Sequence, residues 1–270
     1  MPSEHTIVQC ALMRNFPQRS ALTTVLVAAA LASSAGVARS QTARTVRFES
    51  ATGQATVAIL LPADYDSTAL RYPVLYLLHG GTQNHTAFPA RSWFTRDASQ
   101  RRMIVVMPHL QPFLFSARGD EPAPVEDFLA RELPAYIDSH YRTVTDRRAR
   151  AIAGISMGGY GATLLGVKRP EVFGAVGAIS AALSTGNRPR NVETRVAALM
   201  PDSAPYFYIA CGVADSVIAA SRDLAAQLVK RQIRSELKEV PGGHSWEVWD
   251  PQVRAFFDVL ATLPGWSPAP

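Results

Sequence analysis

The most constraining feature of this 270-residue chain is a glycine-rich turn at 154–159, Gly-Ile-Ser-Met-Gly-Gly. An apolar run at 150–155 precedes it, and small residues at helical spacing follow at 159–167. We therefore predict a strand, a sharp turn and a helix, with Ser156 at the tip of the turn. Such a turn exposes the serine hydroxyl and needs glycine where a Cβ atom would collide. The N–H of Met157 then lies at the start of a helix, where it can point at a developing oxyanion.

The Gly-x-Ser-x-Gly pattern is weak evidence by itself. Gly and Ser each make up about 7% of residues, so three fixed positions recur by chance in roughly one chain of this length in ten. The alternative is a glycine-rich turn that carries an ordinary surface serine. The flanking strand and helix, and two partner residues further along, favour a functional serine.

The first 40 residues have a different character from the rest of the chain. Basic residues precede a short apolar run at 21–32, which ends in small residues and the sequence Ala-Arg-Ser at 38–40. This pattern predicts a secretory signal peptide over 1–40, cleaved before Gln41, and an exported protein that is periplasmic or secreted. The alternative is an uncleaved N-terminal anchor, although the run is short for a membrane span. After cleavage we expect no stable membrane insertion.

The length and composition of the chain are compatible with one large α/β domain over 41–270. Hydrophobic residues make up 47% of the chain, which is enough to form one core. Charged residues make up only 18%, and this balance argues against disorder. The leader carries three of the 27 Lys and Arg and one of the 22 Asp and Glu, so the rest has a net charge of +3. No basic run with interleaved aromatic residues indicates a nucleic-acid partner. Only Cys211 remains after the leader, so no internal disulfide is expected.

Beyond the leader, apolar runs alternate with amphipathic helical patterns. We expect strands at 45–49, 56–61, 72–78, 103–107, 150–155, 174–179, 206–211 and 236–240. We expect helices at 125–137, 159–167, 217–231 and 249–263. The first two strands read as a hairpin through Gly53, and the alternation that follows predicts a mostly parallel, doubly wound sheet with helices on both faces. Reactive groups in such a sheet belong at the carboxyl ends of the strands.

Two residues at such strand ends can complete a catalytic serine. Asp215 follows the strand at 206–211, and His244 lies in the glycine-rich loop between the last strand and the last helix. A serine hydroxyl needs a base to take its proton, and an imidazole needs a carboxylate to fix its tautomer. Each residue has a simpler alternative, a helix N-cap for Asp215 and a loop histidine without a task for His244. Because the order Ser, Asp, His fits this kind of turn, we predict a triad of Ser156, His244 and Asp215.

The loop at 79–82, His-Gly-Gly-Thr, follows another predicted strand. We expect the Gly81 N–H to be the second oxyanion donor beside that of Met157, because a glycine backbone can approach the substrate closely. His79 is expected to position this loop. No metal-ligand spacing and no dinucleotide or phosphate-binding glycine pattern is present, so we expect no metal and no cofactor.

Several residues could contact an ester substrate. We name Thr82, Phe115 and Trp246 as substrate-binding candidates, with Phe113, Leu114 and Trp93 as further members of an apolar acyl or aryl pocket. For each aromatic residue the alternative is ordinary packing.

Five segments together match a known pattern: YLLHGG at 76–81, FLARELPAYIDSHY at 128–141, AGISMGGYGA at 153–162, RPEVF at 169–173 and GGHSW at 242–246. On these segments the sequence resembles the esterase D / "Putative esterase" family of α/β-hydrolases. It implies the α/β-hydrolase fold, Ser156 as nucleophile, Asp215 as acid, His244 as base, and Gly81 and Met157 as oxyanion donors. The segment at 110–124 departs from the family pattern. Many relatives have a longer insertion at this place, and that insertion forms part of their substrate pocket.

These observations predict a serine carboxylic-ester hydrolase that acts on a small-molecule ester with an acyl or aryl group, with carbohydrate-linked esters left open. Two alternatives remain. One is an acyltransferase that uses the same triad, as in the mycolyltransferases of the family. The other is a non-catalytic binding protein on a hydrolase scaffold. The ester and the oligomeric state stay open.

Overall fold

The computed structural model describes residues 42–51, 53–110, 124–183 and 191–270. The predicted signal peptide and its cleavage point lie outside these residues, as does the substrate-binding candidate Phe115 with its neighbours Phe113 and Leu114. In the described part of the chain no helix combines the length and the apolar character needed to cross a bilayer.

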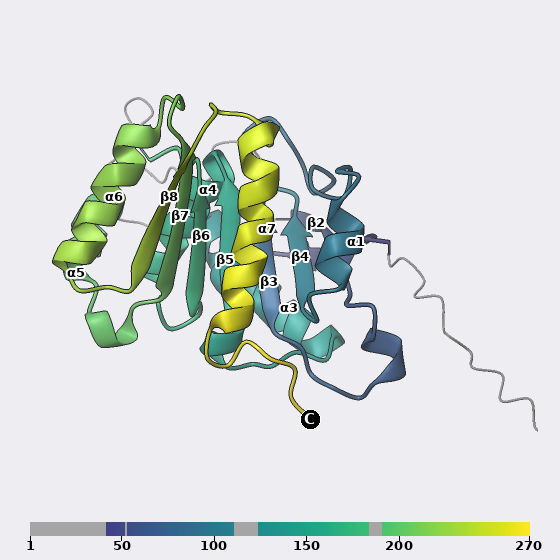
Figure 1. Cartoon of the computed structure of the whole chain (residues 1–270). Helices are drawn as coiled ribbons and strands as arrows, with labels where there is room; N and C mark the ends of the chain where they lie inside the picture. Colours follow the sequence, from purple (N-terminus) through teal and green to yellow (C-terminus); the bar gives the residue numbers. More distant parts are fainter. Residues whose placement is uncertain (1–41, 52, 111–123, 184–190) are drawn as a thin grey trace, which may run out of the picture. The chain divides into compact units, whose positions relative to one another are not determined.

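The described residues form an eight-stranded sheet in the order β1-β2-β4-β3-β5-β6-β7-β8 (Figure 1). Its strands are β1 (Arg44–Ser50), β2 (Gly53–Leu60), β3 (Val74–Leu78), β4 (Ile104–Pro108), β5 (Arg150–Ile155), β6 (Ala175–Ile179), β7 (Tyr206–Gly212) and β8 (Ser235–Val240). β2 runs antiparallel to both β1 and β4, and every other pair is parallel. The predicted hairpin and mostly parallel sheet are therefore confirmed. Gly53 opens β2 with a φ of 101°, a conformation that favours glycine.

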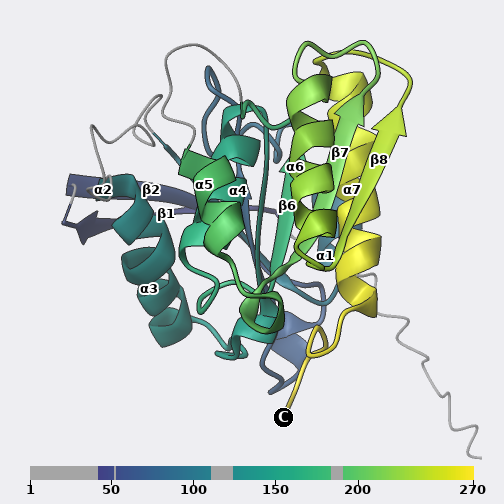
Figure 2. The same cartoon turned by 90° about the vertical axis from the view of Figure 1, so that its left-hand side faces the viewer.

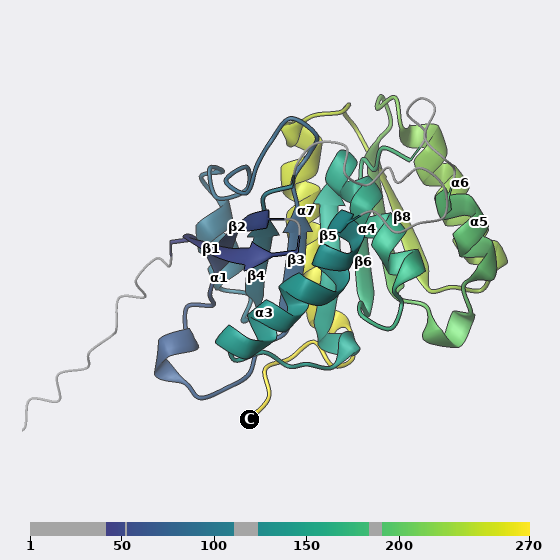
Figure 3. The same cartoon turned by 180° about the vertical axis from the view of Figure 1, so that it is seen from behind.

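Helices cover both faces of the sheet. One face carries α1 (Phe94–Ser99) and α7 (Trp246–Thr262), and the other carries α2 (Pro124–Asp127), α3 (Leu133–His140), α4 (Met157–Lys168), α5 (Asn191–Ala198) and α6 (Ile218–Lys230). Figure 2 shows the sheet between α3 and α7, and Figure 3 shows the face with α3 and α4. Side chains of β3 alternate accordingly, with Leu75 packed in the core beneath α7 and Tyr76 in the core beneath α4.

The helix predicted at 125–137 contains an irregular turn. It runs from α2 through a π-helical turn, Phe128–Glu132, into α3, and Leu133 N–H donates to the carbonyl of Phe128. Pro134 explains the wider turn, because proline has no N–H to continue the ladder and its ring would collide with the carbonyl four residues earlier. The short helices α1 and α5 were not predicted, because fewer than nine residues give little periodicity to read.

Candidate active site

The turn that carries Ser156 joins β5 to α4 and is held by close backbone contacts. Ser156 has φ 53° and ψ −114°, an unusual conformation for a residue with a side chain. Its N–H donates to the carbonyl of Ile179 at 3.0 Å. A Cβ atom on Gly154 would lie 2.4 Å from the carbonyl carbon of Gly158, and one on Gly158 would lie 2.3 Å from the Leu78 oxygen. Both glycines of the Gly-x-Ser-x-Gly pattern are thus sterically required.

Ser156, His244 and Asp215 form one hydrogen-bonded chain. The Ser156 Oγ lies 2.9 Å from His244 Nε2, and His244 Nδ1 lies 3.0 and 2.9 Å from the two carboxylate oxygens of Asp215. The Asp215 side chain is fully buried, whereas 35% of the His244 side chain is exposed. Because the carboxylate faces Nδ1, the proton of a neutral imidazole belongs there, which leaves Nε2 to accept the serine proton.

Asp215 also fulfils part of the alternative that the sequence suggested for it. Its Oδ1 accepts a hydrogen bond from the Val217 N–H at 3.1 Å, just before α6. Val217 itself is the N-cap of that helix, so Asp215 stabilises the turn ahead of the helix. One carboxylate therefore fixes the loop after β7 and orients the imidazole.

Glycines bring the loops after β7 and β8 into contact. A Cβ atom on Gly212 would lie 2.3 Å from the carbonyl oxygen of Gly242, which has a φ of 121°. On the other side of the imidazole, the ring of Trp249 packs perpendicular to His244, with centroids 5.0 Å apart. These contacts hold His244 beside the end of β7.

The loop after β3 lies against the start of α4. A Cβ atom on Gly81 would lie 3.0 Å from Met157 Cγ, so the two predicted oxyanion donors are neighbours. Within the described residues the Gly81 N–H has no hydrogen-bond acceptor. The side chain of Gln83 accepts from the Gly80 N–H at 3.0 Å, and the Gln83 N–H donates to the Gly80 carbonyl at 3.2 Å. Gln83, which was not singled out in the sequence, thus gives this loop a fixed shape.

His79 ties the same loop to the chain after β4, as its predicted positioning role requires. Its Nε2 accepts from the Leu110 N–H at 3.0 Å, so its Nδ1 carries the proton and donates to the Gly80 carbonyl at 2.7 Å. Burial lowers the pKa of His79, and the nearby His109 and His85 lower it further, against the opposing effect of the Gly80 bond. The neutral ring is therefore the form that fits this position.

The remaining substrate-binding candidates lie beside the site or in the core. Thr82 is exposed directly after Gly81, and Trp246 is half-buried at the start of α7. Trp246 also lines an open depression of about 300 Å³ with residues of the loop after β3, namely Gln83, Asn84, Thr86, Ala87, Ala90 and Arg91. Trp93 is 7% exposed and packs against Phe94, which corresponds to its alternative of ordinary packing. Among the described residues no three His, Cys, Asp or Glu side chains are grouped so that they could hold a metal.

A comparison with known families identifies the family of the chain. The Esterase family model, described as "Putative esterase", matches residues 49–206. The chain belongs to this family. The predicted family, one of esterase-type hydrolases, is therefore confirmed.

Individual relatives of the esterase carry related names. It is 32% identical over 171 residues to an endo-1,4-beta-xylanase/feruloyl esterase of Xylanibacter ruminicola, a match that covers 58% of this chain and 22% of that protein. It is 24% identical over 232 residues to an acetyl esterase of Caldicellulosiruptor saccharolyticus, which covers 74% of this chain and 86% of the relative. A solved structure of a ferulic acid esterase superposes with a TM-score of 0.72 at 24% identity, over 82% of this chain and 98% of the other. The structural match confirms the α/β-hydrolase fold.

Proposed function

We propose that this esterase is an exported serine carboxylic-ester hydrolase that works through an acyl-enzyme. The observation that supports it is the 2.9 Å contact between Ser156 Oγ and His244 Nε2, continued from Nδ1 to the buried Asp215. A hydroxyl in this arrangement has a base for its proton, and the base has a carboxylate for the resulting positive charge. Export rests on the signal peptide predicted over 1–40.

In the first half-reaction Ser156 Oγ attacks the ester carbonyl while His244 Nε2 takes the hydroxyl proton. Asp215 holds the Nδ1 proton and stabilises the imidazolium that forms. The N–H groups of Gly81 and Met157 donate to the oxygen on which negative charge develops. As the tetrahedral intermediate collapses, His244 returns the proton to the departing alcohol, which leaves an ester on Ser156.

Water completes the cycle through the same groups. His244 Nε2 takes a proton from water as the water oxygen attacks the acyl carbonyl, and then returns the proton to Ser156 Oγ. The carboxylic acid leaves, and the free enzyme is restored. The exposed side of His244 gives water access to this step.

The proposed substrates are small acyl or aryl esters, carbohydrate-linked ones included. The depression beside the site offers the Trp246 ring together with polar side chains of the loop after β3, including Gln83 and Asn84. An aromatic face with amide groups near it suits an ester that has both apolar and polar parts. The names of the feruloyl and acetyl esterase relatives fall within this range.

The test compares the processed protein with Ser156→Ala on p-nitrophenyl acetate, p-nitrophenyl butyrate and a feruloyl ester. Loss of the nucleophile should lower kcat by roughly 10⁴ to 10⁶. A fluorophosphonate probe should label the wild type and not the variant, because only an activated serine reacts. Ser139→Ala, at an exposed position of α3, is the matched control and should keep both the rate and the labelling. A Ser156→Ala protein with unchanged kcat would overturn the proposal.

A further inference from the structure

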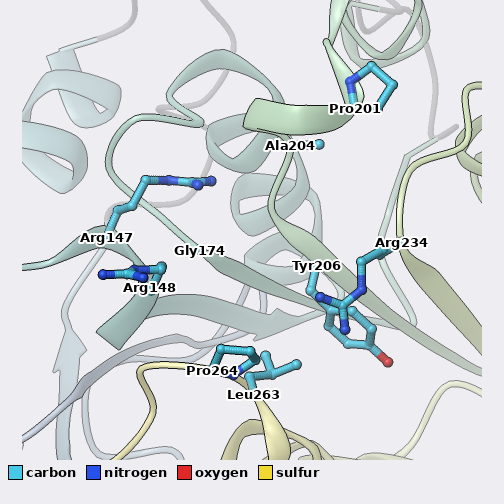
Figure 4. A pocket seen from close by; sticks show the side chains of 9 residues that line it. All are labelled: Arg147, Arg148, Gly174, Pro201, Ala204, Tyr206, Arg234, Leu263 and Pro264. Carbon is cyan, nitrogen blue, oxygen red and sulfur yellow. The ribbon is translucent and has the colours of Figure 1, made fainter.

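A second pocket lies at the opposite end of the sheet from Ser156. It is formed where β5, β6 and β7 begin and where α7 has ended, it is partly open to solvent, and its volume is about 160 Å³ (Figure 4). Ser156 follows the carboxyl end of β5, whereas Arg147 and Arg148 come just before the first residue of β5. Because β5, β6 and β7 are parallel, their amino ends all lie at this edge of the sheet. The length of the strands therefore separates the pocket from the loops of the candidate active site, which follow the carboxyl ends.

Arg147 is fixed in this pocket without losing its charge. Its Nε donates to the carbonyl of Pro170 at 2.6 Å, and its Nη2 donates to those of Phe173 and Ser203 at 3.2 and 3.0 Å. Carbonyl oxygens orient a guanidinium but carry no net charge to neutralise it. Within the described residues Nη1 has no acceptor and remains available as a donor.

Arg234 supplies a second uncompensated guanidinium on the other side of the pocket. It lies over the ring of Tyr206, 5.7 Å from the centroid, and no carboxylate of the described residues pairs with it. The neighbouring carboxylate of Glu236 is paired with Lys238 at 2.9 Å. It also acts on Tyr206, whose pKa is raised first by burial and then by a hydrogen bond to Glu236. Figure 4 shows Arg234 in front of Tyr206 and Arg147 on the far side of the pocket.

The charge of Arg148 is compensated by a carboxylate, unlike that of the other two arginines. Its Nη2 lies 2.6 Å from the Asp146 carboxylate, and its side chain extends away from the other two (Figure 4). Hydrogen bonds from Arg148 lower the pKa of Asp146 to about 2, so this pair stays ionised at neutral pH. No carboxylate of the described residues lines the pocket itself. The pocket therefore carries an excess of positive charge from Arg147 and Arg234.

The rest of the lining is apolar. Leu263 and Pro264 form one wall, Pro201 and Ala204 form another, and the Tyr206 ring lies beneath Arg234. A volume of 160 Å³ corresponds to about five water molecules at liquid density, which is enough for a carboxylate with a small ring. Guanidinium groups match planar oxyanions in geometry and charge, and the apolar walls suit the part of a ligand that is not charged.

We propose that this pocket binds a small organic anion, a carboxylate attached to a compact apolar group. The carboxylate lies between Arg234 and Arg147 Nη1, and the apolar part contacts Leu263, Pro264 and the Tyr206 ring. This site is separate from the catalytic centre, so its existence does not depend on the proposed hydrolysis.

The test is a ligand-observed NMR titration of the whole protein with benzoate, acetate, benzyl alcohol and inorganic phosphate at constant ionic strength. Benzoate should bind more tightly than the other three, because it alone has both the carboxylate and the ring. Arg234→Gln should raise the Kd for benzoate about tenfold, since a charge-assisted hydrogen bond is lost. Arg96→Gln removes an exposed arginine of α1 on another face, so it should leave the Kd unchanged.

The Arg234→Gln protein should fold normally, because Arg234 is exposed and its side chain makes no hydrogen bond to a backbone group of the described residues. Retained esterase activity and an unchanged circular dichroism spectrum check this. Benzoate binding that survives Arg234→Gln would overturn the proposal, as would equal binding of benzyl alcohol. Preferential binding of inorganic phosphate would overturn the choice of an organic carboxylate.

Discussion

The backbone of Gly158 touches the carbonyl oxygen of Leu78, such that a Cβ atom at position 158 would lie 2.3 Å from it. Leu78 ends β3, which leads into the loop that carries Gly81, and Gly158 is in the first turn of α4. The two proposed oxyanion donors are therefore held together by a backbone contact that leaves no space for a methyl group.

We expect Gly158→Ala to push α4 away from β3. The overpacking should cost about 1 to 3 kcal/mol in the free energy of unfolding, measured with urea. Displacing the Ser156 turn by even 1 Å should lower kcat by about 100-fold. Gly243→Ala is the control for stability, because the nearest atom to its added Cβ is 3.8 Å away. A Gly158→Ala protein with wild-type kcat would show that the turn tolerates more movement than this contact implies.

Asp215→Asn should separate the two tasks of this carboxylate. The asparagine oxygen can still accept from the Val217 N–H at Oδ1, so the loop before α6 should keep its shape. The NH₂ group would then face His244 Nδ1 and favour the tautomer that has its proton on Nε2. A protonated Nε2 cannot accept the proton of Ser156. We expect kcat for p-nitrophenyl acetate to fall by about 10⁴ with little change in Tm. A large fall in Tm with normal kcat would assign Asp215 to structure alone.

Stability should decline in mild acid because of His79. Its pKa is lower in the folded protein than in the unfolded chain, so the unfolded state takes up the proton first as the pH falls. The stabilisation by neutral His79 is complete above the ordinary histidine pKa of about 6.5 and is lost as the pH falls from there through the folded-state pKa. Urea unfolding between pH 7.5 and 5 measures this slope. In His79→Gln the free energy of unfolding should depend less steeply on pH. The pH dependence that remains should come from His85, because burial lowers the pKa of that residue too.

The residues of the candidate site that follow local rules could be predicted from the sequence. The strand, turn and helix around Ser156 have a fixed glycine pattern, and Asp215 and His244 each follow a strand in the order that the turn leads one to expect. Side-chain contacts between distant segments leave no such pattern. The bond from the Leu110 N–H to His79 depends on how β3 and β4 pair, which the sequence does not show. The bond from the Gly80 N–H to Gln83 is local, but it depends on a loop conformation that no residue pattern marks.

The same limit applies to the aromatic residues. Trp93 and Trp246 are both tryptophans near helix starts, yet one is enclosed by α7 and α1 while the other borders the depression beside the site. Composition and spacing do not separate these cases, because burial on one face of a helix depends on what packs there.

A buried ion pair links the helix of the nucleophile to α2. Lys168, the last residue of α4, donates to both carboxylate oxygens of Glu126 at 2.9 and 2.6 Å, and the two side chains are only 8% and 6% exposed. Glu126→Gln would leave the ammonium buried without its counter-charge. The free energy of unfolding in urea should fall by about 3 kcal/mol or more.

Two further variants distinguish loss of the pair from loss of packing. Asp127→Asn disrupts the exposed pair with Arg131 on the same turn and should change stability little. Replacing both buried partners, Glu126→Leu with Lys168→Met, removes the charges together and should recover most of the stability that Glu126→Gln loses. If the double variant were as unstable as Glu126→Gln, the shape of the pair rather than its charge would hold α2 against α4.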